Sequence, residues 1–487
     1  MMNHLKQLYQ HSLSLLTDLY QLTMAYGYWK AQKTHQHAVF TLFFRNPPFN
    51  SGYTIAAGLR SVVEYLEDLH FTETDLDYLA SLKGSDGKPL FEQEFITYLG
   101  QLRFHCDIDA IPEGTLVFPQ EPLLRVQGPL LPCQLLETTL LNLINFQTLI
   151  ATKATRICQA AQGQAVLEFG LRRAQGIDGA LMASRAAYIG GCIGTSNVLA
   201  GKLYGIPVKG THAHSWVMSF DNELEAFQAY AQALPNNCIF LVDTYETLAG
   251  INHALQVAKT LREQGHQFLG IRLDSGDLVI LSQQARQMLD KAGFQDARIV
   301  GSSDLDEYLI TQLKQAGAMI DTWGVGTKLI TSYDHPALGG VYKLGALCPD
   351  GKTWQPKLKL SEDTLKISNP GRIQVRRYYQ QNHLVADLLY DESSPSPTLS
   401  EAVDPKTGAP LQLEGAPSED LLVPILREGK CVAQLPSLED IRIRVQQQLQ
   451  HCPEKLKRLV QPEVYPVYLE QHLYSLRQQL IQASQHS

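Results

Sequence analysis

The chain has 487 residues, of which 44% are hydrophobic and 18% are charged, as is ordinary for a globular protein. This length is sufficient for two or three domains. The formal net charge of −8 excludes a general basic surface of the kind that attracts nucleic acids or anionic membranes, so we expect neither as a partner.

The cysteines and the absence of long apolar runs indicate the compartment. The eight cysteines are scattered and form no Cys-x-x-Cys pair, which argues against a zinc ribbon or a disulfide framework. The first residues lack the basic-then-apolar pattern of a signal peptide, and no apolar run is long enough to span a membrane. We therefore expect a cytoplasmic protein.

The N-terminal part of the sequence predicts a mixture of helices and strands. Segments with apolar positions at helical spacing alternate with short β-like runs. We expect an α+β domain over residues 1–130, completed by residues of about 345–391. Helices are expected over residues 15–30, 57–68 and 90–100, and strands over residues 38–44 and 114–127.

The middle of the chain repeats one pattern, a short apolar run that ends at a small polar cluster and is followed by a helical segment. Most of these run ends are about thirty residues apart, the length of one βα unit. Polar groups at the C-terminal ends of parallel strands build the active site of a βα barrel. We predict an irregular βα barrel over residues 131–344, entered through a long helix over 131–162. The runs lie within residues 166–173, 206–217, 239–244, 269–277, 298–304 and 322–327.

The last part of the chain, residues 392–487, is predicted to hold a linker and a helical C-terminal extension. Residues 392–418 are rich in Ser, Pro, Gly and Glu, which is typical of a linker or an exposed loop. Residues 436–487 are Gln-rich and have apolar positions at helical spacing.

Two histidines in Gly210-Thr-His-Ala-His-Ser215 are the sharpest candidates for chemistry. His212 and His214 are two positions apart, so their side chains would point the same way on an extended segment. A histidine oriented by a carboxylate can act as a nucleophile. A zinc site would need a third ligand, and none has suitable spacing. Packing at a strand end is the remaining alternative.

Charged residues end two of the other runs. Arg272 and Asp274 would lie on the same side of a strand and face one ligand together, or they form only a structural ion pair. Asp243 could accept a hydrogen bond from a histidine, or hold a ribose hydroxyl or a metal. Its alternative role is the N-cap of a helix over residues 244–261.

Glycine-containing turns and two arginines are candidates for anion binding. The backbone N–H groups of 301–304 and of 324–328 could cradle a phosphate, although neither segment has the spacing of a P-loop and both could be tight turns only. Arg172 and Arg173 follow a turn, where a guanidinium suits a carboxylate or a phosphate. A solvated surface pair is the alternative.

Taken in order, these segments resemble those of nicotinate phosphoribosyltransferases, which are type II phosphoribosyltransferases. The resemblance covers nearly the whole chain, because its motifs run from the first helix to Tyr465-Pro-Val-Tyr-Leu469. Six ordered motifs carry it: Leu15-Leu-Thr-Asp-Leu-Tyr-Gln21, Glu168-Phe-Gly-Leu-Arg-Arg-Ala-Gln-Gly176, Ser196-Asn-Val-Leu-Ala-Gly201, Gly210-Thr-His-Ala-His-Ser215, Arg272-Leu-Asp-Ser-Gly-Asp277 and Gly324-Val-Gly-Thr327.

The resemblance implies a reaction and an assembly. Nicotinate and 5-phosphoribosyl 1-pyrophosphate would give nicotinate mononucleotide and pyrophosphate with Mg²⁺, as the first step of NAD salvage from nicotinate. ATP hydrolysis would be coupled to this transfer through a phosphohistidine. The protein would be a homodimer with shared active sites.

The resemblance also implies roles for individual residues, while the Mg²⁺ ligands stay unassigned. His214 matches the phosphorylated histidine, and Asp243 would orient it. Arg272 and Asp274 would meet the pyridine substrate and the ribose. His212 occupies a variable position of its motif, where it would act at most as a helper. The other implied substrate contacts are Tyr20 from the second subunit, Phe169, Arg172, Thr211, Ser303 (where many members have asparagine), Gly326 and Thr327.

Several other functions stay open at this point. A nicotinamide-using phosphoribosyltransferase shares the design, whereas quinolinate enzymes are shorter and lack the phosphohistidine motif. A catalytically silent homologue could act as a ligand-binding or scaffolding subunit, but it would not need His214, Asp243, Arg272 and Asp274 together. A zinc hydrolase on a βα barrel is a further alternative.

Overall fold

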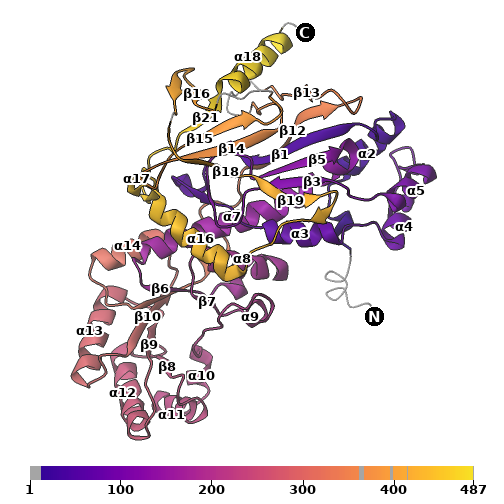
Figure 1. Cartoon of the computed structure of the whole chain (residues 1–487). Coiled ribbons are helices and arrows are strands. Elements are labelled where there is room, and N and C mark those ends of the chain that lie inside the picture. Colours follow the sequence, from indigo (N-terminus) through magenta and orange to yellow (C-terminus); the bar gives the residue numbers. More distant parts are fainter. Residues whose placement is uncertain (1–11, 361–366, 395–398, 414, 486–487) are drawn as a thin grey trace. The chain divides into compact units, whose positions relative to one another are not determined.

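The computed structural model describes residues 12–360, 367–394, 399–413 and 415–485 (Figure 1). The chain forms two compact units. The first contains residues up to Thr148 and residues from Ala337 onward, and the second contains Leu149–Pro336. The boundary therefore falls inside one helix, α7 (Glu137–Ala160).

The first unit is built on a seven-stranded sheet in the order β13-β12-β1-β5-β3-β19-β20. Strand β1 (His37–Phe44) lies inside this sheet and buries seven of its eight residues, as its nearly unbroken apolar sequence predicts. It pairs antiparallel with β5 (Leu124–Pro129) and with β12 (Gly340–Cys348). The other strands are β3 (Asp107–Ala110), β13 (Gln355–Pro356), β19 (Val423–Arg427) and β20 (Lys430–Cys431), and a separate pair joins β2 (Thr54–Ile55) to β4 (Leu116–Val117).

Helices of the first unit are mostly amphipathic and pack their apolar faces into its core. Helix α2 (Leu19–Lys30) and helix α5 (Gln93–Gln101) contribute Leu22 and Phe95 to one buried cluster. The predicted helix over 131–162 is two helices, because Leu136 separates α6 (Leu130–Leu135) from α7. The remaining elements are η1 (Leu13–Leu15), η2 (Pro48–Asn50), α3 (Leu59–Glu67) and α4 (Glu73–Ser81).

A second, six-stranded sheet of the same unit has the order β17-β16-β21-β15-β14-β18. The segment 392–418 was expected to be a linker, yet it contains two short strands that join this sheet through pairing with β21. Buried Ala402 and Val403 hold them there. Runs of three residues are too short for a periodic signal in the sequence. The elements are β14 (Ile373–Gln380), β15 (His383–Asp391), β16 (Glu401–Val403), β17 (Pro410–Gln412), β18 (Ser418–Asp420), β21 (Val467–Glu470), α16 (Leu438–His451), α17 (Glu454–Lys457) and α18 (Gln471–Gln485).

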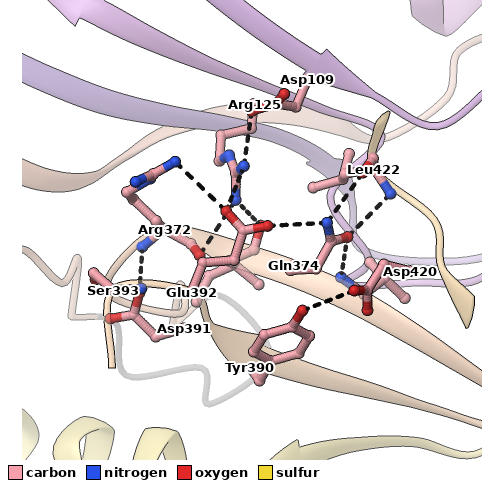
Figure 2. A network of polar contacts seen from close by, with 12 residues as sticks. Asp109, Arg125, Arg372, Gln374, Tyr390, Asp391, Glu392, Ser393, Asp420 and Leu422 are labelled. Atoms are coloured by element: carbon pink, nitrogen blue, oxygen red, sulfur yellow. Dashed lines mark hydrogen bonds and ion pairs between the residues drawn. The ribbon is translucent and has the colours of Figure 1, made fainter. Parts of the chain in front are cut away.

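A network of charges joins the two sheets of the first unit (Figure 2). Arg125 on β5 is 2.7 Å from Asp109 on β3 and 2.7 Å from Glu392, which follows β15. Arg372 lies 3.5 Å from the same Glu392 carboxylate, and the Gln374 amide donates to it at 3.1 Å. Both arginines of this network thus have a carboxylate partner, which offsets the cost of removing charge from water.

The second unit contains a sheet of six parallel strands in the order β7-β6-β11-β10-β9-β8. Helices lie along its outer side, among them α12 and α13 (Figure 1). The predicted irregular βα barrel is therefore present, with the C-terminal strand ends at one edge. Its strands are β6 (Ala165–Glu168), β7 (Gly194–Thr195), β8 (Ile239–Leu241), β9 (Gly270–Leu273), β10 (Arg298–Ser303) and β11 (Thr322–Val325). Its helices are η3 (Leu171–Arg173), α8 (Ile177–Ile189), α9 (Val198–Tyr204), α10 (His214–Met218), α11 (Glu223–Ala233), α12 (Thr247–Glu263), α13 (Leu278–Lys291), α14 (Glu307–Gln315) and α15 (Thr327–Ile330).

One predicted run of the barrel is not a strand. Residues 206–209 make only an isolated parallel bridge between Val208 and Thr195. The chain then continues without regular structure until α10 begins at His214. None of the helices in the described parts of the chain combines the length and the apolar character needed to span a bilayer.

We predict that Arg377→Met destabilises the first unit by about 3–5 kcal/mol, because it leaves a buried carboxylate without its cation. Arg377 is fully buried and lies 2.6 Å from the buried Asp387 carboxylate. The neighbouring Arg376→Met is the matched control. Its partner Asp420 is partly exposed, so we expect a loss of about 1 kcal/mol or less. Urea unfolding followed by circular dichroism measures both, and equal losses would contradict the burial argument.

Candidate active site

Arg272, at the end of β9, is the centre of a polar cluster in the second unit. Its Nε donates to Ser302 Oγ at 2.7 Å and its Nη1 to Thr211 Oγ1 at 3.1 Å. Its Nη2 donates to Asp274 Oδ1 at 2.7 Å. The guanidinium carbon lies 5.5 Å from the centre of the Phe169 ring, within the range of a cation–π contact. One side chain therefore gathers groups from several strand ends.

The prediction that Arg272 and Asp274 lie on the same side is confirmed, and the two also pair with each other. Ser302 Oγ donates to Asp274 Oδ1 at 2.5 Å. Burial opposes ionisation of Asp274, but the hydrogen bond from Ser302 and the charge of Arg272 outweigh it, so the pKa of this carboxyl lies below its ordinary value. Asp274 is thus a carboxylate at neutral pH.

Asp243 follows β8 and has one satisfied and one unsatisfied oxygen. Its Oδ2 accepts the Asp274 N–H at 2.8 Å and Ser275 Oγ at 2.7 Å. Its Oδ1 is buried and has no hydrogen-bond partner. Asp243 is not a helix N-cap, because Glu246 caps α12. A buried carboxylate oxygen left open at a strand end is suited to a ligand hydroxyl or a cation.

The expectation that Asp243 orients His214 is wrong for this structure. His214 begins α10 and its Nδ1 is 3.1 Å from Thr244 Oγ1. Its Nε2 is 3.8 Å from Asp274 Oδ2. Asp243 Oδ2 instead accepts from the Asp274 N–H and from Ser275 Oγ, and Oδ1 has no partner. Thr244 was missed by the sequence analysis, although it directly follows a residue that was singled out.

His212 is a packing residue and not a helper of His214. Its ring lies against Tyr230, with the ring centres 5.1 Å apart, and its Nε2 accepts the Leu241 N–H at 3.2 Å. Burial lowers the pKa of His212 to about 4 against the opposing effect of a hydrogen bond to the Ala213 carbonyl, so the ring is neutral at pH 7. The two histidines do not point the same way, because the segment turns into α10 at His214 instead of staying extended.

A buried carboxylate fixes the loop that carries Phe169. Glu168, at the end of β6, accepts hydrogen bonds from Ser184 Oγ at 2.9 Å, from Thr195 Oγ1 at 2.5 Å and from the Gly170 N–H. These three donors satisfy a side chain that is almost fully buried. Sequence reasoning quoted Glu168 in a motif but assigned it no role, since its partners are distant along the chain.

The glycines of β11 and of its following turn make room for this loop. A Cβ atom on Gly324 would lie 2.7 Å from the Phe169 ring, which no real Cβ contact allows. Gly326 is the residue before α15 and Thr327 is the first residue of that helix, and both are half-buried. Their predicted role in binding a phosphate stays a prediction.

Three other predicted contacts lie outside the hydrogen-bonded cluster. Ser303 is exposed, whereas the neighbouring Ser302 is in the cluster, because successive residues of a strand point to opposite sides. Arg172 is exposed on η3. Tyr20 belongs to α2 of the first unit and is 48% exposed. Within the described residues, no group of three or more His, Cys, Asp or Glu side chains is arranged to hold a metal ion.

Family models cover most of the chain. The model of the nicotinate phosphoribosyltransferase N-terminal domain matches residues 15–145, the model of the nicotinate phosphoribosyltransferase family matches 165–380, and the model of the C-terminal domain matches 372–477. Nicotinate phosphoribosyltransferase of Bacillus subtilis (strain 168) is 46% identical over 476 residues, which are 96% of this chain and 95% of that protein. The chain belongs to the nicotinate phosphoribosyltransferase family.

Solved structures agree with this assignment. The crystal structure of human nicotinic acid phosphoribosyltransferase has a TM-score of 0.83 at 34% identity and covers 95% of this chain and 99% of its own. Nicotinate-nucleotide pyrophosphorylase from Pyrococcus furiosus, with a TM-score of 0.68 at 22% identity over 89% of this chain and 94% of its own, shares the fold. The predicted fold, an irregular type II phosphoribosyltransferase barrel with an α+β N-terminal domain, is confirmed. The C-terminal part is not a purely helical extension, because its strands β16 to β21 join the two sheets of the first unit.

We predict that Ser302→Ala lowers kcat/KM for phosphoribosyl transfer by at least about tenfold. The change removes hydrogen bonds to two charged groups, Arg272 and Asp274, each worth about 1.5–3 kcal/mol. Ser303→Ala, the adjacent control, should change kcat/KM by no more than about twofold, because an exposed serine outside the cluster contributes little. Steady-state kinetics measure kcat/KM for both variants. A larger loss in Ser303→Ala would show that Ser303, as the family resemblance implies, and not Ser302, contacts the substrate.

Proposed function

We propose that the protein transfers the 5-phosphoribosyl group from phosphoribosyl pyrophosphate to nicotinate, giving nicotinate mononucleotide and pyrophosphate. The observation that carries this proposal is the Arg272–Asp274–Ser302 cluster beside Phe169, at the strand ends of the barrel, in a member of this family. An aromatic ring next to a guanidinium suits a planar ring that bears a carboxylate.

The chemistry requires positioning and charge neutralisation more than a strong base. Transfer breaks the bond between ribose C1 and pyrophosphate and forms a bond from C1 to the pyridine nitrogen, through an oxocarbenium-like state. The ionised Asp274 supplies negative charge near this developing cation, and Arg272 supplies positive charge for the substrate carboxylate. The Glu168 network holds the Phe169 loop in place, which fixes the substrate orientation.

The residues of this site fit Mg²⁺. The buried Asp243 Oδ1 has no partner. The ionised Asp274 lies close by, because its backbone N–H donates to the other oxygen of Asp243. Carboxylate oxygens are the ligands that Mg²⁺ takes. We propose that Asp243 and Asp274 hold the ion or its water shell. When bound, the ion neutralises the charge of the leaving pyrophosphate.

We further propose that ATP is a co-substrate and that His214 is the residue it phosphorylates. The His214 side chain is 39% exposed, so a phosphate can reach it. Its Nδ1 is engaged by Thr244, which leaves Nε2 for attack. Nε2 would form a bond to the γ-phosphorus while the bond to the β-phosphate oxygen breaks, releasing ADP. Water later cleaves the N–P bond and releases phosphate. Thr244 thus takes the orienting role first expected of Asp243.

A homodimer with shared sites remains our proposal for the assembly. The N-terminal segment presents a row of exposed apolar side chains that a second subunit would cover: Leu13, Leu16, Leu19, Tyr20 and Met24. Tyr20 would then stack on the pyridine ring in the neighbouring subunit's site.

All eight cysteines are free thiols, which favours a reducing compartment such as the cytoplasm.

We predict that nicotinate is used with a kcat/KM at least about tenfold higher than nicotinamide. The N–H groups of Arg272 that are not bonded within the protein can donate charge-assisted hydrogen bonds to a carboxylate, whereas a neutral amide is a weaker acceptor, a difference of about 1–3 kcal/mol. Product formation from each pyridine, measured with and without ATP, tests both the reaction and the specificity. Equal use of both pyridines would overturn the specificity but not the reaction. No product from either would favour a catalytically silent homologue.

We predict that His214→Asn abolishes phosphorylation by ATP and ATP hydrolysis while slow ATP-independent transfer remains, because Arg272 and Asp274 are intact. The adduct in the unaltered protein should be acid-labile and base-stable, as a phosphoramidate is. His253→Gln is the matched control in the same unit, since His253 pairs with Glu223 outside the cluster. His212→Asn is less suitable, because burial makes it a stability variant. Intact-mass spectra detect the phosphoryl adduct. If it survives in His214→Asn, His214 is not the phosphorylated residue.

A further inference from the structure

An ion pair joins the loops that follow the last two strands of the barrel. Asp306 lies between β10 and α14, Lys328 belongs to α15 after β11, and the Lys328 Nζ is 2.7 Å from Asp306 Oδ2. The side chains are 22% and 9% exposed for Lys328 and Asp306, so solvent screens the pair only weakly. The loops after the last strands of a barrel often bind a phosphate group. Lys328 directly follows Gly326 and Thr327, whose predicted role is to bind such a phosphate.

Both members of the pair are charged at neutral pH. Burial opposes ionisation of Asp306, but the hydrogen bonds from the Leu309 N–H and from Lys328 outweigh it, so the pKa of this carboxyl lies below its ordinary value. At Lys328 the hydrogen bond to Asp306 outweighs burial and raises the pKa of the ammonium group. The contact is thus a charge-assisted hydrogen bond, which is roughly twice as strong as a neutral one.

Asp306 is itself held in place by the helix that it begins. Its Oδ1 accepts the Leu309 N–H at 2.7 Å and caps α14. The next residue, Glu307, is fully buried and lies 2.8 Å from Arg156 and 2.7 Å from Lys153, which both belong to α7. The start of α14 is therefore fixed, and Lys328 is attached to a fixed point.

Helix α15 depends on contacts with its neighbours to stay in place. It has four residues, too few for a helix to be stable by its own hydrogen bonds. One side packs against the loop that carries Phe169, since a Cβ atom on Gly170 would lie 2.5 Å from the Ile330 Cβ atom. The pair of Lys328 with Asp306 attaches α15 to the loop after β10 as well.

We propose that Asp306 and Lys328 are positioning residues for the 5′-phosphate of phosphoribosyl pyrophosphate. The pair fixes the start of α15 and with it the backbone of Gly326 and Thr327, so the phosphate meets donors that are already in place. Lys328 acts through this turn and not by contact with the phosphate. This inference rests on the proposed function, because it assigns the pair to the phosphoribosyl substrate.

Steady-state kinetics of Lys328→Met and Asp306→Asn test the proposal. Asparagine also caps helices, so the second variant removes the ion pair but keeps the cap of α14. We expect each change to raise KM for phosphoribosyl pyrophosphate at least about fivefold. KM for nicotinate should change no more than about twofold, because Glu168 holds the Phe169 loop separately.

Two further variants show that the pair acts as a unit. Lys328→Arg keeps a cation that can bond to Asp306, so it should hold KM for phosphoribosyl pyrophosphate within about threefold of the unaltered protein. The double variant of Lys328→Met and Asp306→Asn should be no worse than either single variant, because all three remove the same interaction. Lys259→Met is the matched control. It removes an exposed lysine of α12 in the same unit and should leave both KM values unchanged.

Three results would overturn the proposal. The first is an unchanged KM for phosphoribosyl pyrophosphate in Asp306→Asn. The second is a lower KM in this variant, which would show that Lys328, once released, binds the phosphate itself. The third is an equal rise of both KM values, which indicates a general loosening of the site. If Lys328→Met fails to fold by circular dichroism, Asp306→Asn and Lys328→Arg provide the same test.

A direct binding measurement separates this proposal from the proposed function. If the unaltered protein makes no nicotinate mononucleotide, the proposed function fails, and calorimetric titration with ribose 5-phosphate replaces the KM values. Weaker binding in Lys328→Met and Asp306→Asn then supports the positioning pair, whereas equal or absent binding overturns it.

Discussion

The hydrogen bonds of Arg272 are the interaction on which the candidate site depends. A guanidinium has five N–H donors in a rigid fork, and here three of its nitrogens bond to groups that come from three separate segments. The Thr211 segment has no regular structure of its own, so this contact helps to define where it lies. A lysine could not replace this geometry, because its single ammonium lacks the planar fork.

Carboxylates complete the site by dividing their tasks. Asp274 is kept ionised by Arg272 and Ser302, and its backbone N–H engages Asp243. Asp243 uses one oxygen for the backbone and leaves the other open. Glu168 has no open oxygen to offer a ligand, since it accepts three hydrogen bonds within the protein. The hydrogen-bond donors around each carboxylate thus decide its role: Asp274 provides negative charge, Asp243 can bind a ligand, and Glu168 holds a loop in place.

Buried cations in both units pair with carboxylates, and in the second unit Lys153 and Arg156 share the buried Glu307. In the first unit most buried arginines are locked to carboxylates, and they hold the two sheets together (Figure 2). In the second unit Arg272 is paired but still 18% exposed, so it can exchange part of its pairing for a ligand. Full pairing suits a structural role, and incomplete pairing suits binding.

The sequence by itself determined the class of fold and the main members of the site. The repeated apolar runs predicted the parallel strands, and the two-residue spacing of Arg272 and Asp274 placed both at one strand end, because alternation along a strand is a local property. The family resemblance likewise depended on ordered local motifs, and the comparisons confirm it.

Only the tertiary structure decided which neighbours each side chain meets. Ser302 lies in the cluster and Ser303 outside it, and His212 is buried among aromatic rings. His214 contacts Thr244 and not Asp243. The tertiary structure also formed β16 and β17 where the composition indicated a linker. These outcomes depend on contacts between residues that are about twenty or more positions apart in the sequence. Such contacts are set by how the strands and helices pack, and no local pattern in the sequence records them.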